Sequence, residues 1–264
     1  MGRRALRLGL WLAWLGWPAG AVAQVPRLLA PPPQTAFLSR FDYPLAIEAL
    51  SGRDPQFRWD ADVGGEFDIV GGPRGRATTA FNYEAILGDE FQPFDPNQGN
   101  YAIELTGAGR RGRMEFAGVF HHTSRHRGDR PKWFGIAWNL LGAQVTWTDV
   151  RVRRTWQVQA RAARIVMKDA VDYTGEYSAN VLYAQPWRSR LALVGRASGV
   201  VRTIDARISD RGAQAGGRGE LALRIRGAAA DLEVHAGVER RIEASMPYPR
   251  PKTWALVGLR VLSR

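Results

Sequence analysis

The chain has no cysteine among its 264 residues. This excludes a disulfide framework, a thiolate nucleophile and a cysteine-bound metal. Beyond the first 23 residues, the chain also lacks an apolar run long enough to cross a bilayer as a helix. Histidine is scarce, with four in the sequence, yet His121, His122 and His126 fall within six consecutive positions. Such a concentration of titratable groups can transfer protons, bind a metal or activate a nucleophile.

The first 23 residues have the pattern of a secretory signal peptide, followed by a proline-rich lead-in at 24–36. The apolar run is too short to span a bilayer, and four prolines within 25–34 exclude a helix or a central strand. We therefore expect an exported chain with one folded domain, residues 37–264. In the signal peptide, the positive start consists of Arg3, Arg4 and Arg7. The apolar run is 8–17, and the cleavage pattern is Ala21-Val22-Ala23.

The formal net charge is +12, and removal of the three leader arginines leaves +9. A basic balance often indicates nucleic acid, but here the arginines are dispersed and the chain is predicted to be exported. Nucleic acid is therefore not an expected partner. Anionic lipid headgroups and saccharide phosphates fit this charge and this destination better.

From residue 58 onward, polar and apolar residues alternate with period two, which indicates β-strands. In 58–69, for example, Trp59, Ala61 and Val63 share one face, and Asp60 and Asp62 share the other. Eleven strands are expected from this point. Residues 37–50 are either a twelfth, first strand or an amphipathic helix interrupted by Pro44. The eleven segments are 58–69, 80–87, 101–106, 114–120, 132–149, 156–162, 173–183, 190–202, 220–226, 232–239 and 253–262.

Two all-β architectures fit this pattern. In a soluble sandwich or lipocalin-like barrel the apolar face is the core, whereas in an outer-membrane barrel it meets lipid. Segments long enough to cross a tilted bilayer, polar faces of both signs, aromatic residues near segment ends and alternating short and long connections favour the second. We expect an antiparallel up-and-down transmembrane β-barrel of about 12 strands, with acids and arginines paired across its lumen. His235, between Glu233 and Glu239, is expected to be a hydrogen-bonded lumen residue.

Two local features of this barrel are less regular. In 132–149 the apolar parity changes, and a bulge near Leu141-Gly142 would explain the change. Residues 89–100 are acidic and rich in turn-forming residues. Their oxygen ligands could suit calcium, but turn chemistry around Asp95-Pro96-Asn97 explains them better.

The histidine cluster is expected at the external end of an ascending strand. Parity predicts that His122 and Ser124 face lipid, while His121 and Thr123 face the lumen. His122-Thr123-Ser124 resembles the His-x-Ser motif of outer-membrane lipid A deacylases. The resemblance implies that His122 is the base and Ser124 the nucleophile of an ester hydrolase. Asp129 is the candidate for the acid that orients His122.

A longer resemblance, over 122–129, is to uncharacterised barrels that carry His-x-Ser-x-His-x-Gly-Asp. It implies no known activity, and three other interpretations of the segment therefore stay open. The segment is a polar rim that meets lipid, it binds a metal through His122, His126 and Asp129, or it borders a small channel. In the rim interpretation, the candidates for lipid or lipopolysaccharide phosphate are Arg125, Arg127, Arg130 and Lys132.

We expect outer-membrane lipids, and lipopolysaccharide among them, as partners. The resemblance to outer-membrane barrels further implies insertion by the barrel assembly machinery and a monomeric state. Arginines beside the histidines would repel a cation, so no metal and no cofactor are expected.

Overall fold

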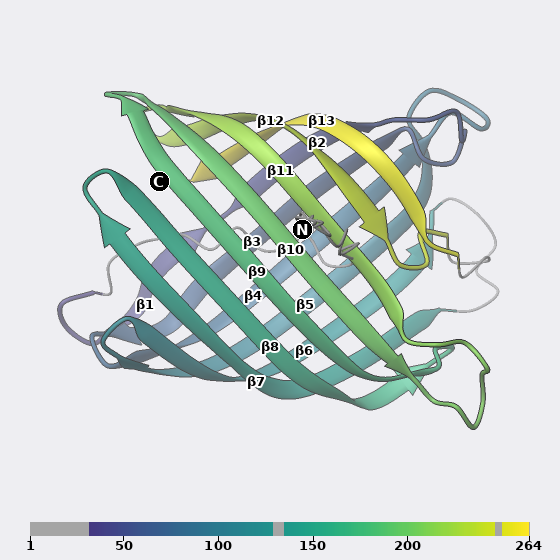
Figure 1. Cartoon of the computed structure of the whole chain (residues 1–264), viewed down its shortest axis with the longest axis horizontal. Helices are drawn as coiled ribbons and strands as arrows, with labels where there is room; N and C mark the ends of the chain where they lie inside the picture. Colours follow the sequence, from purple (N-terminus) through teal and green to yellow (C-terminus); the bar gives the residue numbers. More distant parts are fainter. Residues whose placement is uncertain (1–31, 129–134, 246–249, 264) are drawn as a thin grey trace, which may run out of the picture.

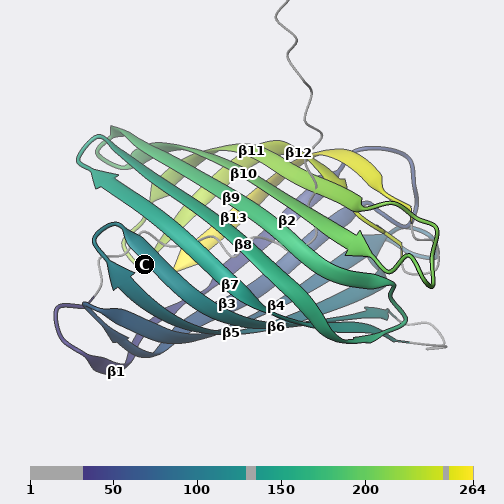
Figure 2. The ribbon, with the colours of Figure 1, turned by 60° about the horizontal axis from the view of Figure 1, so that its bottom comes forward.

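The structure, a computed structural model, describes residues 32–128, 135–245 and 250–263. One antiparallel sheet closes on itself into a barrel (Figures 1 and 2). Within the described residues no helix is long and apolar enough to cross a membrane. The strands are β1 (Ala36–Asp42), β2 (Pro44–Leu50), β3 (Trp59–Gly72), β4 (Gly75–Gly88), β5 (Asp95–Arg111), β6 (Met114–Arg127), β7 (Ile136–Arg151), β8 (Arg154–Asp169), β9 (Tyr173–Arg188), β10 (Leu191–Ile204), β11 (Gln214–Arg226), β12 (Ala230–Arg241) and β13 (Lys252–Ser263).

The first two strands share one position in the barrel. β1 pairs with the second half of β3, and β2 pairs with its first half, so the two form one strand interrupted at Tyr43. β2 also pairs with β13, and the β3–β4 pairing completes the ring. The expected twelve-stranded antiparallel barrel is therefore confirmed, with residues 37–50 as strand rather than helix.

The connections alternate in length around the ring. Figure 1 shows the short turns at the end that holds the C-terminus and the longer loops at the opposite end. The proposed signal peptide and most of the lead-in lie outside the described residues. The short turns are 73–74, 112–113, 152–153, 189–190 and 227–229. At the opposite end the long loops are 51–58, 89–94, 128–135, 205–213 and 242–251, and one connection there, 170–172, is as short as 227–229.

The barrel wall is apolar outside and charged inside. On the outer face, Ile103 and Phe116 are 49% and 56% exposed, whereas the lumen residues Glu233 and Arg260 are 0% and 4% exposed. A soluble barrel would have the opposite arrangement, because a protein surrounded by water buries its apolar side chains in the interior. This inverted polarity is that of a barrel surrounded by lipid, so the lipocalin-like alternative is excluded.

Arginines form ion pairs along the inner wall, as Arg202 does with Glu176 on the neighbouring strand, and also across the lumen. Three of them reach over two intervening strands, from β8 to β5, from β11 to β2 and from β12 to β3. His235 is 2% exposed, and its Nε2 lies 2.8 Å from Glu48 Oε1, which confirms the expected lumen histidine. The three long pairs are Arg161–Glu104, Arg218–Glu48 and Arg241–Asp60, at 2.8–2.9, 2.8 and 2.6 Å.

Two expectations about the strands were wrong. β7 keeps one parity and pairs with β6 in continuous register, so it has no bulge at Leu141-Gly142. The register shift nearby, between Asn139 and Leu140, is in the β7–β8 pairing, and the extra residue there is on β8. Trp138 and Leu140 instead point inward, where they pack with Ile136 and Tyr173 in a small apolar cluster. β5 also begins at Asp95, earlier than expected, because residues 95–98 continue the ladder despite their turn-like composition.

The buried carboxylate of Glu233 tests the lumen network. It accepts hydrogen bonds from Arg196, Arg224 and Arg260. Replacing Glu233 with alanine leaves three arginines short of a partner, and we expect a loss of about 3–5 kcal/mol in the free energy of unfolding. Urea unfolding of the refolded barrel, followed by heat-modifiable migration, measures the loss. The matched control is Asp210→Ala in an exposed loop, and equal unfolding midpoints for the two variants would contradict the prediction.

Candidate functional site

A serine, two histidines and an asparagine lie together on the lipid-facing wall near the long-loop end. Ser124 lies three residues before the end of β6, and its Oγ is 2.7 Å from His126 Nε2. Residues two apart on a strand point to the same side, so His122 and His126 both flank Ser124 on the outer face. A hydroxyl with an imidazole nitrogen at this distance is the arrangement that activates a serine.

His122 is held by an amide on the neighbouring strand. Its Nδ1 donates to Asn139 Oδ1 at 2.6 Å, because an amide oxygen can only accept. Asn139 stands opposite His122 in the β6–β7 ladder, and its own Nδ2 donates to Met167 Sδ at 3.2 Å. This bond selects the tautomer in which Nε2 carries a lone pair. Within the described residues, no hydrogen bond joins His122 to Ser124.

Aromatic rings support the other side of the serine. The Tyr101 ring meets the His126 ring edge-on at 5.6 Å and lies 4.8 Å from the Tyr83 ring. Gly99 makes this possible, because a Cβ there would come within 3.0 Å of Tyr83 Oη. Tyr101 on β5, with Tyr83 on β4 behind it, therefore supports one side of the His126 ring.

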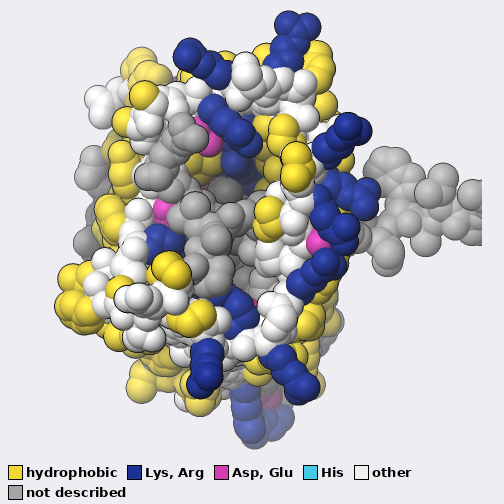
Figure 3. Space-filling view, turned by 90° about the vertical axis from the view of Figure 1, so that its left-hand side faces the viewer, with side chains coloured by type: hydrophobic (Ala, Val, Ile, Leu, Met, Phe, Trp, Pro, Cys, Tyr) yellow, Lys and Arg dark blue, Asp and Glu magenta, His cyan; other side chains and the backbone are white. Residues whose placement is uncertain are grey.

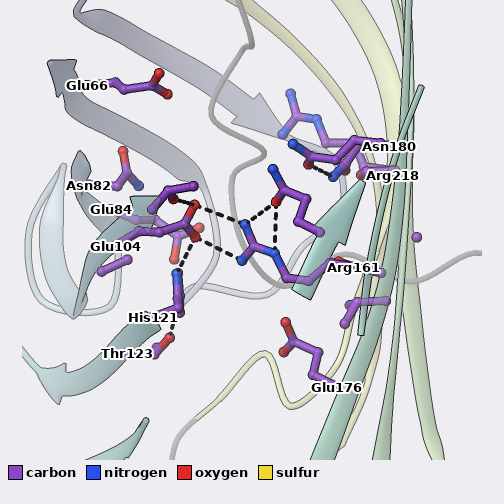
Figure 4. A pocket seen from close by; sticks show the side chains of 18 of the residues that line it. Glu66, Asn82, Glu84, Glu104, His121, Thr123, Arg161, Glu176, Asn180 and Arg218 are labelled. Carbon is purple, nitrogen blue, oxygen red and sulfur yellow. Dashed lines mark hydrogen bonds and ion pairs between the residues drawn. The ribbon is translucent and has the colours of Figure 1, made fainter. Parts of the chain in front are cut away.

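The inner face of the same strand carries a separate chain of hydrogen bonds. His121 Nδ1 donates to Glu104 Oε2 at 2.9 Å, and His121 Nε2 lies 3.0 Å from Thr123 Oγ1. Arg161 closes the chain from across the lumen by binding Glu104 (Figure 4). The predicted parity of β6 holds in the structure, and the barrel wall separates the two groups of side chains.

These inner residues border a polar cavity of about 200 Å³ inside the barrel. Toward the long loops, Phe57, Ile86 and Ala244 are all 0% exposed. These side chains occupy part of the lumen at that end. Other side chains that line it include Gln144, Asn180 and Ser198.

Arg125 does not have the predicted role in phosphate binding. It is 6% exposed and points inward, where its Nη2 donates to the carbonyl oxygens of Glu243 and Ala244 at 2.8 and 3.3 Å. Parity is the reason, because Arg125 follows outward-facing Ser124 by one residue. Arg125 instead fastens the segment 242–245 over the lumen.

The remaining predicted residues stand as follows. Arg127 is half-buried at the last position of β6. Asp129, Arg130 and Lys132 lie outside the described residues, so the candidate acid partner and two candidate phosphate ligands stay predictions. Asn139 was missed because the phase of 132–149 was read with a bulge. With continuous parity, Asn139 is a polar residue on a wall that should be apolar, which is the signal that could have revealed it.

Two groups of lumen side chains could approach a metal ion. In each, the ligand atoms lie within 4.8 Å of one another. Arg218 pairs with a carboxylate of one group and Arg241 with a carboxylate of the other, so each group already has an arginine cation beside it. In the acidic loop, for which the sequence favours turn chemistry over calcium binding, Asp89 pairs with Arg58 and Asn97 donates to Gln56 O, so both side chains have protein partners. The two groups are Glu48, Glu220 and His235, and Asp60, Asp62 and Glu84.

No family model and no curated protein matches the chain. Solved structures do match it. It is similar to outer membrane phospholipase A from Escherichia coli, with a TM-score of 0.52 and 13% identity over 86% of this chain and 98% of that one. For the outer membrane phospholipase of Salmonella typhi, the TM-score is 0.50 and the identity 12%, over 85% of this chain and 90% of that one. For LpxR from Salmonella typhimurium, the TM-score is 0.49 and the identity 6%, over 84% of this chain and 99% of that one. The two phospholipase likenesses show the fold, that of an outer-membrane β-barrel.

An ion-pair bridge at the long-loop end predicts a pH response. Arg211 binds Asp172, with Nε 2.9 Å from Oδ2, and also Glu243, so it joins three loops. Partial burial raises the pKa of Asp172, but hydrogen bonds from Arg211 and Ser209 and the charge of Arg211 outweigh it, and the pKa lies below its usual value. A lowered pKa stabilises the folded form above the unfolded value, near 3.9, and this stabilisation is lost as pH falls through the lower folded pKa.

We therefore expect the amides of 205–213 to be protected from hydrogen exchange, relative to their intrinsic rate at each pH, at neutral pH and to lose protection only below about pH 4. Arg211→Gln should show low protection at every pH, because the bridge is then absent. Hydrogen exchange followed by mass spectrometry measures both. Loop opening between pH 5 and 7 in the unmodified protein would show that Asp172 does not control it.

Proposed function

We propose that this chain is an outer-membrane serine hydrolase that cleaves acyl esters of outer-leaflet lipids. The observation that carries the proposal is the position of Ser124 on the lipid-facing wall between two imidazoles, with its Oγ 2.7 Å from His126 Nε2 and His122 on its other side. A nucleophile on this face meets membrane lipid rather than a solute in the lumen. The fold shared with outer membrane phospholipase A supports a lipid ester as the substrate class.

The roles follow from the two imidazoles that flank the serine. We assign Ser124 as nucleophile and His122 as general base, because Asn139 fixes the tautomer that leaves His122 Nε2 able to accept a proton. Rotation of the Ser124 hydroxyl from His126 toward His122 would engage this base. His126 then holds the hydroxyl in the resting arrangement.

The reaction divides into two steps. Ser124 Oγ attacks the ester carbonyl while His122 Nε2 takes its proton, and the lipid alcohol leaves with that proton from His122. Water then attacks the acyl-serine, His122 accepts a proton from the water, and the fatty acid is released as Ser124 regains its proton. Asn139 keeps the imidazole oriented through both steps.

The outer wall beside the site suits an acyl chain. Ile103 faces His122 across the β5–β6 ladder, and Leu105 faces Phe120 one step further from the long loops. These apolar side chains are 36–49% exposed and lie where hydrocarbon would contact the barrel. Arg130 and Lys132 stay the proposed ligands for the lipid phosphate, because Arg125 is engaged inside the barrel.

A small channel is the weaker proposal. Ion pairs cross the lumen, and buried apolar side chains occupy part of its long-loop end. Both features oppose ion or solute flow, so planar-bilayer conductance of the refolded barrel is expected to be absent.

Purified protein in mixed micelles tests the hydrolase directly, with phospholipid and lipid A supplied as separate substrates. We expect fatty acid release, and a loss of about a thousandfold or more in Ser124→Ala. His122→Ala should lose about 10²–10⁴-fold and Asn139→Ala less, whereas His126→Ala should keep most of the activity. Mass spectrometry of the lipids identifies the cleaved bond.

The control is Thr123→Val, a change on the inner face of the same strand, which should leave release unchanged. If His126→Ala is inactive and His122→Ala is active, the base is His126. If neither substrate is cleaved, or cleavage survives Ser124→Ala, the proposed function is wrong.

A further inference from the structure

The short-turn end of the barrel carries a dense ring of exposed arginines. They lie in or beside all five short turns, so they surround most of the mouth. Figure 3 looks onto this end and shows basic side chains distributed around its rim. We call them the arginine arc, and its members are Arg74, Arg111, Arg113, Arg151, Arg153, Arg154, Arg188, Arg190 and Arg226.

The arc has few carboxylates among its nine arginines: Asp149, and Asp231, which stands opposite Arg226 in the β11–β12 ladder. Asp149 pairs with Arg113 and Arg151 at 3.1 and 3.0 Å. Five other arginines lie in or beside the turns 112–113, 152–153 and 189–190. Within the described chain none of these five has a carboxylate at ion-pair distance. They are Arg111, Arg153, Arg154, Arg188 and Arg190. The exposed acidic residues of the described chain, Asp89, Glu90, Asp169 and Asp210, all stand at the opposite, long-loop end. The two ends of the barrel therefore differ sharply in charge.

Aromatic side chains place the arc at the edge of the bilayer. Trp187 is 60% exposed on β9 and stacks with the guanidinium of Arg188 at 5.7 Å. The rings of Trp156 and Tyr183, on the neighbouring strands β8 and β9, lie 4.6 Å apart close to the same turns. Tryptophan and tyrosine concentrate where hydrocarbon gives way to headgroups. The arginines beyond them are then level with lipid phosphates.

We propose that the arginine arc binds the phosphate groups of anionic phospholipids in the membrane leaflet around the short turns. Guanidinium groups hold phosphate oxygens with paired hydrogen bonds, and adjacent turns bring several such groups together. Short turns face the periplasm in outer-membrane barrels, so the ligands are phospholipids of the periplasmic leaflet. The proposal does not depend on Ser124 chemistry, because the arc is at the other end of the barrel.

Native mass spectrometry of the full-length mature barrel, refolded in detergent with an equal mixture of phosphatidylglycerol and phosphatidylcholine, tests the proposal. We expect phosphatidylglycerol to be retained selectively. The triple variant Arg153→Gln, Arg154→Gln, Arg188→Gln should bind it about tenfold or more weakly, because each arginine near an anionic surface strengthens association. The matched control, Arg53→Gln, Arg207→Gln, Arg250→Gln, removes the same charge from exposed long-loop positions and should bind normally.

Competition separates the possible sources of phosphate. Millimolar inorganic phosphate should not displace the lipid, and lipid A should compete less well than phosphatidylglycerol. Equal losses in the two triple variants, or full displacement by inorganic phosphate, would overturn the proposal. Stronger retention of lipid A on the arc would overturn the assigned leaflet. Heat-modifiable migration confirms that each variant is folded.

Discussion

Buried arginine–carboxylate pairs hold together the inside of a barrel whose outside is apolar. Removing charges from water costs several kcal/mol per ion, so each lumen charge needs a partner of opposite sign with good geometry. Pairs that skip two strands, such as Arg241 with Asp60, meet this need across the barrel and join distant parts of the wall. The side chains of these cross-lumen ion pairs also occupy the space that a wide pore would require.

The period of a β-strand then decides which chemistry meets which surroundings. Five consecutive polar residues of β6, from His121 to Arg125, alternate between the lumen and the lipid. His121 and Arg125 belong to the inner hydrogen bonds, whereas Ser124 belongs to the outer ones. A register slip of one residue would exchange the two sets. The charged lumen network opposes that slip, because it would transfer arginines to lipid and apolar side chains to the ion pairs.

The strand pattern and the parity of the histidine cluster could be predicted from the sequence, because both depend on a local repeat of two. The sequence could predict that acids and arginines pair in the lumen, but it could not predict which residues pair with each other. Arg218, Arg241 and Arg260 bind residues that lie 170, 181 and 40 positions away, and the pairing depends on how the sheet closes. Asn139 was missed for another reason. Trp138 and Leu140 are apolar residues inside the lumen, so apolar character alone gave the wrong face for that stretch.

The distance between the two ends of β6 connects the arginine arc with the serine site. Ser124 is ten residues from Met114, which adjoins the short turn. At ~3.3 Å per residue and a tilt near 40°, this corresponds to a rise of about 25 Å, close to the height of the apolar band of such barrels. With the arginines level with the phosphates of one leaflet, Ser124 reaches the opposite interface, where the ester bonds of the other leaflet lie. The arc would then do more than bind lipid, since by setting the depth of the barrel it would align the nucleophile with its substrate.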